Sequence, residues 1–315
     1  MAESAATRAV AERLVACFEA LGARRVEAGI LQPAGPLLDL YGEDIRARAF
    51  ITTDPLSGEA MLRPDFTVPV VQRHLEGGGG EARYTYAGEV FRKQEEDTGR
   101  PSEYIQVGYE HIGGPDRARA DADMFAAFHE LLAPLGVKPA TGDIGILIAA
   151  VQGLDTTQAR KSALLRHLWR PRRFRALIDR FRAPPETRSR VAKSGSPTIG
   201  RRTRGDVDTR LAALAEDAAA PPLSADQAEM LDGLLRLNGG AASVLSQLHR
   251  LSSEFREILS AVENFGKRLD ALSGAGLDVD ELPFETSYGR TTLEYYDGFV
   301  FGFYIEDRPD LPPVA

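Results

Sequence analysis

Cysteine is almost absent from this sequence: Cys17 is the only one in 315 residues. An intramolecular disulfide and a cysteine-ligated metal cluster each need at least two cysteines, so both are excluded. The histidines do not show the spacing of a helical metal site either, because none of the five stands four positions from another. We therefore expect no metal site and no bound cofactor.

Long apolar runs are also missing. No stretch reaches the roughly 18 residues that a membrane-spanning helix needs, and the N-terminal segment lacks the pattern of a signal peptide. Its apolar residues recur every three or four positions, which predicts an amphipathic helix. That apolar stripe contains Ala9, Val10, Leu14, Val15 and Phe18. We expect a cytoplasmic protein that does not bind membranes, with the Cys17 thiol buried beside the stripe.

Two features that would indicate a nucleotide or nucleic-acid ligand are missing. Residues 76–81 are glycine-rich, but no lysine and no clear helix start follow them, so they read as a connector and not as a phosphate-binding loop. The net charge is −8, whereas nucleic-acid binding relies on neutralising phosphates with basic side chains. We expect no nucleic-acid partner.

One segment, RHLWRPRRFRALIDRFR (166–182), is rich in arginine and has two interpretations. The more ordinary one is a solvated helix pair whose arginines face an acidic neighbour. The other is a partner-docking or anion-contacting surface with Trp169 and Phe174 as apolar anchors, because Arg and Trp are favoured at binding hot spots.

The strongest signal comes from two segments that read as the strands of one hairpin: RYTYAGEVFRKQE (83–95) and EYIQVGYEHIG (103–113). Side chains two residues apart share one face of a strand. Gln106 and Glu110 therefore share a face, with Gly108 leaving room between them, and Arg92 joins the same surface. A guanidinium, an amide and a carboxylate suit a zwitterionic ligand; a solvated sheet face is the alternative.

Other parts of the chain have clear local signals. Residues 42–65 read as a hairpin, and residues 120–136 read as a helix that ends at Gly136. Residues 155–283 show helical periodicity and little strand signal. Within them, residues 182–206 mix Pro, Gly, Ser and Arg, which predicts a mobile loop.

Five segments, in this order along the chain, resemble the core of class II aminoacyl-tRNA synthetases, and specifically the histidyl branch. LQPAGPLLDLYGED (31–44) resembles motif 1 of the dimer interface, and LRPDFT (62–67) resembles the branch's Leu-Arg-Pro-Glu-Gly-Thr motif. GEVFRKQE (88–95) resembles motif 2, and IQVGYE (105–110) matches Gln-x-x-x-Glu. LEYYDGFVF (293–301) resembles the histidine-reading Leu-Asp-Tyr-Tyr segment.

The resemblance implies an α+β fold in which a class II synthetase-like antiparallel sheet is flanked by helices and interrupted by a helical insertion. The core would comprise residues 1–153 and 284–315, and residues 154–283 would form the insertion. No segment resembles motif 3 or an anticodon-binding domain. Because motif 3 completes the sheet in this fold, we expect an exposed sheet edge near the end of the chain.

The departures from the synthetase pattern affect the groups that activate an amino acid with ATP. The synthetase has an arginine at the position of Thr291, where it contacts the phosphate. It has a glutamate at the position of Gln94, where it engages the adenine. The resemblance therefore implies a retained histidine pocket without the adenylation machinery and without catalytic residues.

This combination resembles the regulatory subunit of short-form ATP phosphoribosyltransferase, a non-catalytic paralogue of histidyl-tRNA synthetase that shares LRPDFT. The resemblance implies a chain that activates a catalytic subunit in the first step of histidine biosynthesis and senses L-histidine for allosteric feedback inhibition. It also implies a self-dimer through the motif 1 region. A degenerate or truncated histidyl-tRNA synthetase core, or an amino-acid-binding module with another client, are the alternatives.

The same resemblance assigns roles in the pocket. Asp65 and Thr67 would hold the α-ammonium of histidine with help from Gln106, and Arg92 would take the carboxylate. Glu110 and Tyr296 would contact the two imidazole nitrogens. Tyr295 comes from the same strand as Tyr296, and alternation makes one of the two tyrosines a core residue.

Overall fold

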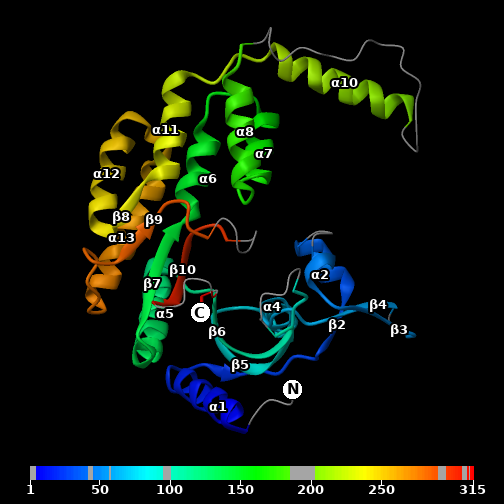
Figure 1. Cartoon of the computed structure of the whole chain (residues 1–315), viewed down its shortest axis with the longest axis vertical. Helices are drawn as coiled ribbons and strands as arrows, with labels where there is room; N and C mark the ends of the chain where they lie inside the picture. The colour runs from blue at the N-terminus through cyan, green and yellow to red at the C-terminus, as the bar shows by residue number, and fades with distance from the viewer. Residues whose placement is uncertain are drawn as a thin grey trace. The chain divides into compact units, whose positions relative to one another are not determined.

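The computed structural model describes most of the chain, namely residues 5–41, 45–56, 58–94, 101–184, 203–289, 296–306, 311 and 313–315. The chain divides into two compact units, Met1–Ala120 and Asp121–Ala315. Figure 1 shows the elements of both in the order of the chain. Helices and strands are mixed in each unit, so the predicted α+β class is confirmed.

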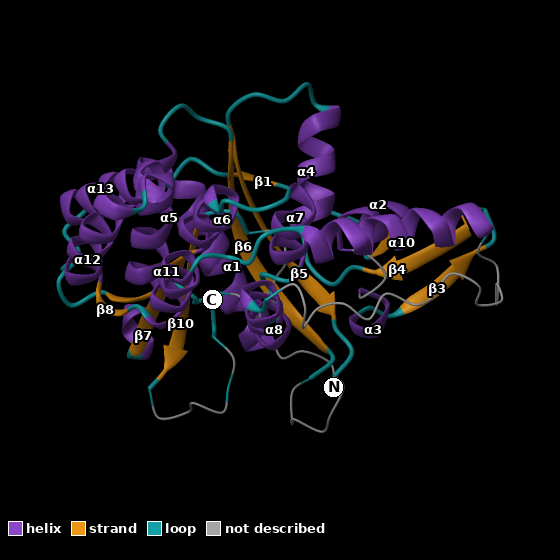
Figure 2. Cartoon of the chain, turned by 90° about the horizontal axis from the view of Figure 1, so that it is seen from above, coloured by secondary structure: helices purple, strands orange, loops and turns teal. Residues whose placement is uncertain are grey.

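The first unit contains two small sheets and four helices among its described residues. Its elements are α1 (Ala5–Ala20), β1 (Arg24–Arg25), β2 (Leu31–Pro33), α2 (Ala34–Tyr41), α3 (Ile45–Arg48), β3 (Ile51–Asp54), β4 (Gly58–Leu62), α4 (Thr67–Glu76), β5 (Ala82–Phe91) and β6 (Glu103–Ile112). β3 and β4 form the hairpin predicted within residues 42–65, and β2 pairs with the other edge of β4. Figure 2 shows the β3–β4 hairpin and the longer β5–β6 hairpin as separate pairs of strands.

The β5–β6 hairpin has the predicted antiparallel register. Tyr84 is opposite Glu110, Tyr86 is opposite Gly108, and Gly88 is opposite Gln106. Because the side chains of such pairs point to the same face, these residues form one continuous surface. β1 runs parallel to β5 and extends the sheet to three strands.

Helix α1 packs on the first unit through a narrower stripe than the sequence predicts. Val15 and Phe18 are buried as expected, but Val10 is 44% exposed. The prediction of a buried Cys17 is wrong, because its side chain is exposed. In a helix each residue turns by about 100°, so Cys17 is rotated away from both of its buried neighbours in the stripe.

The second unit holds a four-stranded sheet with the order β10-β7-β9-β8 and a large helical part. Its elements are α5 (Arg117–Leu132, which begins in the first unit), a 3₁₀ turn (Ala133–Leu135), β7 (Val137–Asp143), α6 (Ile144–Gly153), α7 (Gln158–Arg166), α8 (Pro171–Arg182), α10 (Arg204–Ala219), α11 (Ala225–Arg236), β8 (Asn238–Gly240), α12 (Ala241–Glu254), a 3₁₀ turn (Arg256–Ile258), α13 (Leu259–Gly274), β9 (Pro283–Glu285) and β10 (Phe299–Ile305). Gly136, in a left-handed conformation, ends the 3₁₀ turn that follows α5, so the predicted C-cap at Gly136 is confirmed.

The predicted helical character of residues 155–283 is confirmed, since the three residues of β8 and the first residue of β9 are the only strand residues described there. The predicted mobile loop lies mostly outside the described residues. The second compact unit begins near residue 120, because α5, β7 and α6 share one hydrophobic core with the following helices. The border between core and insertion at residue 154 stays a prediction.

The edge of β10 that was expected to be exposed is partly paired. The amide of Phe303 donates to the Ala315 carbonyl at 2.8 Å, and the amide of Val314 donates to the Phe303 carbonyl at 2.7 Å. Residues 314 and 315 therefore satisfy backbone groups on this edge of β10.

Three arginines of α8 support the ordinary interpretation of the arginine-rich segment. Arg175 and Arg182 pair with Asp232 at 3.1 and 3.7 Å, and Arg180 pairs with Asp217 at 2.7 Å. The predicted anchor Phe174 is fully buried, so it cannot serve as a surface anchor. Among the helices of the described residues, none is both long and apolar enough to cross a membrane.

Candidate functional site

The candidate site is centred on the carboxylate of Glu110 on β6. The hydroxyl of Thr67 donates to Glu110 Oε1 at 2.9 Å, and the hydroxyl of Tyr86 donates to the same oxygen at 3.1 Å. Thr67 is the first residue of α4, whereas Tyr86 lies on β5. Three separate elements of the first unit therefore converge on one carboxylate.

Burial controls the acidity of this cluster. It raises the pKa of Glu110 above its ordinary value; the hydrogen bonds from Thr67 and Tyr86 oppose the rise, and the charge of Asp65 adds to it. Burial also raises the pKa of Tyr86 well above its ordinary value, with the charge of Glu110 as the next cause. Tyr86 is therefore a hydrogen-bond donor throughout the physiological range.

Asp65 brings a second carboxylate to the cluster. It is only 8% exposed, and its charge acts on both Glu110 and Tyr86. Two nearby carboxylates disfavour each other's ionised form. A cationic group placed between them would relieve that repulsion, which makes the cluster suited to an ammonium or an imidazolium.

The LRPDFT segment, which carries Asp65, is held in place by the contacts of Arg63 and Phe66. The buried Arg63 donates through Nε to the Glu89 carbonyl at 2.7 Å and through Nη1 to the Ala28 carbonyl. Its guanidinium lies 4.0 Å from the centre of the Phe66 ring, and that ring stacks on Tyr86 at 4.3 Å. The LRPDFT segment is thereby fixed to β5, the strand that carries Tyr86.

The glycines of the hairpin are required by close packing on this face. A Cβ at Gly108 would overlap the ring of Tyr86, and a Cβ at Gly88 would lie 2.5 Å from Arg63 Nη2. The room that Gly108 leaves between Gln106 and Glu110 is thus occupied by the ring of Tyr86. Any side chain at either position would displace the groups that contact Glu110 or hold Asp65.

Gln106 and Arg92 extend the same surface toward the end of β5. The Gln106 Oε1 atom is buried and has no hydrogen-bond partner among the described residues. Arg92 donates through Nε to the Pro64 carbonyl at 2.8 Å, and its guanidinium lies 5.8 Å from the centre of the Tyr104 ring. Five of the seven predicted site residues are therefore on neighbouring parts of the first unit.

The remaining predicted residues belong to the second unit. Tyr296 is partly buried and packs against the hydrophobic core of that unit. Tyr295 and Thr291 lie outside the described residues. Gln94, the other position that departs from the synthetase pattern, donates through Nε2 to the Arg92 carbonyl at 3.3 Å.

Tyr86 and Arg63 are site residues that the sequence analysis did not assign. Tyr86 lies directly opposite Gly108 in the hairpin. A large side chain that faces a glycine was the sequence signal that could have assigned Tyr86 to the site. Arg63 had no such signal, because its partners are backbone carbonyls. No cluster of three or more potential metal ligands occurs in the part of the chain that the structure describes.

Comparison with known proteins identifies the fold and the family. Residues 1–196 match the model of the histidyl-tRNA synthetase family. The crystal structure of an ATP phosphoribosyltransferase regulatory subunit/histidyl-tRNA synthetase from Bacillus halodurans matches with a TM-score of 0.66 and 21% identity, over 95% of this chain and 68% of that one. The histidyl-tRNA synthetase of Nostoc sp. PCC 7120 matches with a TM-score of 0.64 and 15% identity over 98% of this chain and 63% of that one. The protein thus has the class II fold of the histidyl-tRNA synthetases, as predicted.

Curated relatives narrow the family further. The ATP phosphoribosyltransferase regulatory subunit of Sinorhizobium medicae is 31% identical over 94% of this chain and 86% of its own length. That of Rhizobium meliloti is 31% identical over 96% of this chain and 86% of its own length. The chain belongs to the family of ATP phosphoribosyltransferase regulatory subunits, which are non-catalytic proteins of histidine biosynthesis.

Proposed function

We propose that this chain binds L-histidine through the Glu110 cluster and thereby controls the catalytic subunit of ATP phosphoribosyltransferase. The observation that carries the proposal is the convergence of Thr67 and Tyr86 on Glu110, with the charge of Asp65 beside them. Such a cluster prefers a ligand with more than one cationic or N–H group. Histidine has two, its ammonium and its imidazole.

Each part of histidine has a matching group in the proposed site. Asp65 and Thr67 hold the ammonium, and the unpaired amide oxygen of Gln106 accepts a further hydrogen bond from it. Arg92 keeps its guanidinium beside Pro64 through Nε, which leaves the Nη groups for the ligand carboxylate. Glu110 accepts from the imidazole, and the sequence resemblance adds Tyr295 and Tyr296 to the proposed set.

The selectivity of this site follows from the groups it buries. A ligand without an imidazole leaves Glu110 without its ligand partner in a buried environment, which carries a large desolvation penalty. Histidinol lacks the carboxylate and should bind more weakly because Arg92 loses its partner. An apolar amino acid should not bind measurably.

The proposed partner is the short catalytic subunit, which the family name implies for the relatives. Histidine and the catalytic centre then lie on different chains, so inhibition is allosteric and needs an element with two arrangements. By reciprocity, the inhibited form of the catalytic subunit raises histidine affinity here by the factor with which histidine favours that form.

We also propose that two copies of the chain associate through the motif 1 region. The support is the resemblance of residues 31–44 to motif 1, together with apolar side chains exposed on or near β2 and α2. They are Ile30, Leu31 and Leu40, which are 44%, 46% and 53% exposed. Burying exposed apolar side chains favours association.

The test is an assay of phosphoribosyl-ATP formation by the catalytic subunit with wild-type chain or Glu110→Gln. Wild type should activate the catalytic subunit and make it sensitive to histidine. Glu110→Gln should still activate it but resist histidine. Glu76→Gln, at an exposed position of α4, is the matched control and should behave as wild type. Equal histidine sensitivity of wild type and Glu110→Gln would place the sensor elsewhere.

A further inference from the structure

A second group lies on the same strand face as Glu110, around the buried guanidinium of Arg63. Gly88 of β5 pairs with Gln106 of β6 in the hairpin, and alternation places both on that face. A Cβ at Gly88 would lie 2.5 Å from Arg63 Nη2 and 3.0 Å from the tip of the Phe66 ring. The guanidinium therefore covers this face at the strand pair formed by Gly88 and Gln106.

The ring of Phe66 lies between this group and the Glu110 cluster. The Arg63 guanidinium lies 4.0 Å from the centre of the Phe66 ring, and the Tyr86 ring stacks on Phe66 at 4.3 Å. Two groups this close to the centre of one ring lie on its opposite faces, because they would overlap on a single face. The stack therefore has Tyr86, with its bond to Glu110, at one end and Arg63 at the other.

The hydrogen bonds of Arg63 leave one of its nitrogens unused. Nε donates to the Glu89 carbonyl at 2.7 Å, and Nη1 donates to the Ala28 carbonyl. Nη2 donates to no described residue, since Glu89 Oε2 at 3.9 Å is beyond hydrogen-bond distance. Across the strand pair, the buried Gln106 Oε1 also has no hydrogen-bond partner among the described residues. A donor and an acceptor are thus both left open at this end of the stack.

The positive charge of Arg63 is only partly compensated. The residue is 4% exposed, and burial lowers the pKa of its guanidinium, while the charge of Glu89 opposes the fall. Glu89 is shared with another cation, because its Oε1 accepts from Arg8 at 2.7 Å. A buried cation without a close carboxylate retains a desolvation cost. An anionic group of a ligand beside Nη2 would reduce that cost.

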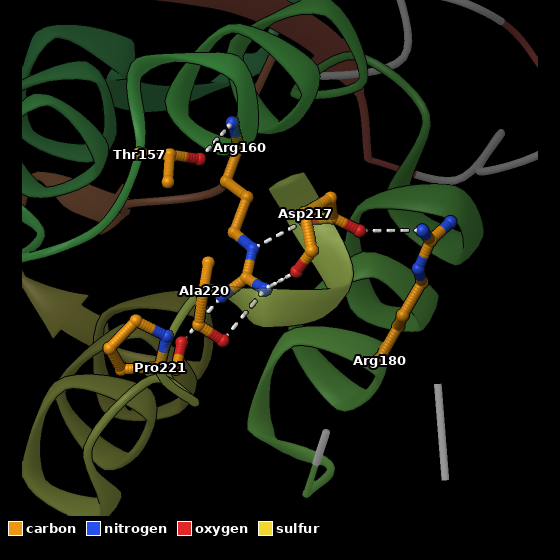
Figure 3. A network of polar contacts seen from close by, with 6 residues as sticks. All are labelled: Thr157, Arg160, Arg180, Asp217, Ala220 and Pro221. Atoms are coloured by element: carbon orange, nitrogen blue, oxygen red, sulfur yellow. Dashed lines mark hydrogen bonds and ion pairs between the residues drawn. The ribbon is translucent and has the colours of Figure 1, made fainter. Parts of the chain in front are cut away.

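Arg160 of α7 shows how a buried arginine is satisfied when its role is structural. It is 1% exposed, and its Nε donates to Asp217 Oδ1 at 2.6 Å. Its Nη1 donates to the Pro221 carbonyl at 2.6 Å, and its Nη2 donates to the carbonyls of Asp217 and Ala220, as Figure 3 shows. Every nitrogen of this guanidinium has a partner, and a carboxylate is in direct contact. Arg63 differs in both respects.

We propose that Arg63 is a specificity-determining residue of the histidine site: its Nη2 donates to the carboxylate of the ligand while Gln106 Oε1 accepts from the ammonium. An α-amino acid carries these two groups on one carbon, so a donor and an acceptor on one strand pair match it. The inference rests on the proposed histidine function and adds Arg63 to it, beside Arg92. All of the residues that carry it belong to the first unit.

The experiment measures the affinities for L-histidine and L-histidinol by calorimetry in wild type and Arg63→Lys. Histidinol keeps the ammonium and the imidazole but has no carboxylate. A lysine keeps the charge but cannot hold two carbonyls and reach the ligand at once. The ratio of histidine affinity to histidinol affinity should fall by about tenfold or more, as expected for one lost charge-assisted hydrogen bond. A loss through displacement of Asp65 would weaken both ligands alike and leave the ratio unchanged.

Three further variants separate recognition by Arg63 from other effects. Gly88→Ala keeps the arginine but displaces Nη2, so it should lower the same ratio. In an Arg92→Lys background, Arg63→Lys should lower the ratio again, whereas an effect passed on through Arg92 would disappear. Arg160→Lys, the matched control, should unfold at lower temperature and keep both affinities.

The outcomes distinguish the inference from the proposed function. An unchanged ratio in Arg63→Lys or in Gly88→Ala would overturn the inference, as would an effect of Arg63→Lys that disappears in the Arg92→Lys background. Wild-type protein that gives no heat with histidine would instead overturn the proposed function.

Discussion

Gly108 and Tyr86 face each other across the β5–β6 ladder, and the tyrosine ring fills the space that a side chain at position 108 would need. The absence of a side chain on one strand therefore sets the position of the Tyr86 hydroxyl on the other. That hydroxyl donates to Glu110, two residues beyond Gly108 on the same face.

Gly108→Ala should displace Tyr86 and weaken both the fold and the site. Inserting a methyl group into a packed region typically costs about 1–3 kcal/mol of stability. We expect that loss in urea unfolding, together with weaker histidine binding in calorimetry. Gly233→Ala is the control, because a Cβ at this position in α11 meets no atom within 4 Å. It should keep its histidine affinity and be slightly stabilised, as expected for Gly to Ala in a helix.

Tyr86→Phe should reduce histidine affinity without disturbing the packing of the first unit. The ring keeps its stacking on Phe66, but Glu110 loses one of its two donors. A hydrogen bond to a charged group is worth about 1.5–3 kcal/mol, so the affinity should fall about tenfold or more. Tyr109→Phe, on the opposite face of β6, should bind histidine as wild type does. An unchanged affinity in Tyr86→Phe would remove Tyr86 from the site.

The raised pKa of Glu110 predicts how stability depends on pH. The folded protein binds the Glu110 proton more tightly than the unfolded chain, because burial raises the pKa above the ordinary 4.5. The stability from this group is therefore fully present below the unfolded pKa and is lost as pH rises through the folded pKa. Urea unfolding at a series of pH values should show this loss for wild type and not for Glu110→Gln. Identical pH profiles of the two proteins would contradict the assignment.

Histidine binding should depend on pH in the opposite sense. The ionised form of Glu110 is the one that accepts from an imidazole, so affinity should rise as pH increases through the raised pKa of Glu110. The imidazole of histidine also titrates, which adds a second pH dependence to the affinity. The analogue 1,2,4-triazole-3-alanine has a less basic ring, so its affinity reports the titration of the protein without that of the ligand. Calorimetry with both ligands against wild type and Glu110→Gln measures the contribution of the protein.

Arg160→Met should destabilise the second unit strongly. Removing one partner of a buried ion pair leaves an uncompensated charge and costs about 3–5 kcal/mol. Burial alone would raise the pKa of Asp217, but Arg160 and Arg180 outweigh it and lower the pKa below its ordinary value. The stabilisation is thus present above the unfolded pKa and lost as pH falls through the folded one. Arg204→Met, whose exposed i,i+4 pair with Asp208 is worth little, is the control.

Much of the candidate site follows from local sequence. Alternation along β5 and β6 is enough to place Arg92, Gln106 and Glu110 on one face, since a strand has only two faces and the hairpin register is tightly specified. The order of the five motifs is enough to indicate the family. The helical character of residues 155–283 also follows from local periodicity.

Other features were decided only by the tertiary structure. The exposure of Cys17 depends on which side of α1 meets the first unit, and the carbonyl partners of Arg63 come from β5 and from the chain before β2. The pairing of Ala315 with Phe303 joins two backbone segments, so it leaves no mark in the side-chain pattern.

The sequence by itself therefore determined the family, the class of fold and the side chains that line one strand face, because each of these is encoded in residue identity and short-range periodicity. The tertiary structure alone decided that Tyr86 fills the gap opposite Gly108, and that Arg268 links Asp121, Asp143 and Phe299. The physical reason is that a contact between residues distant in sequence depends on the packing of whole elements, which no local pattern specifies.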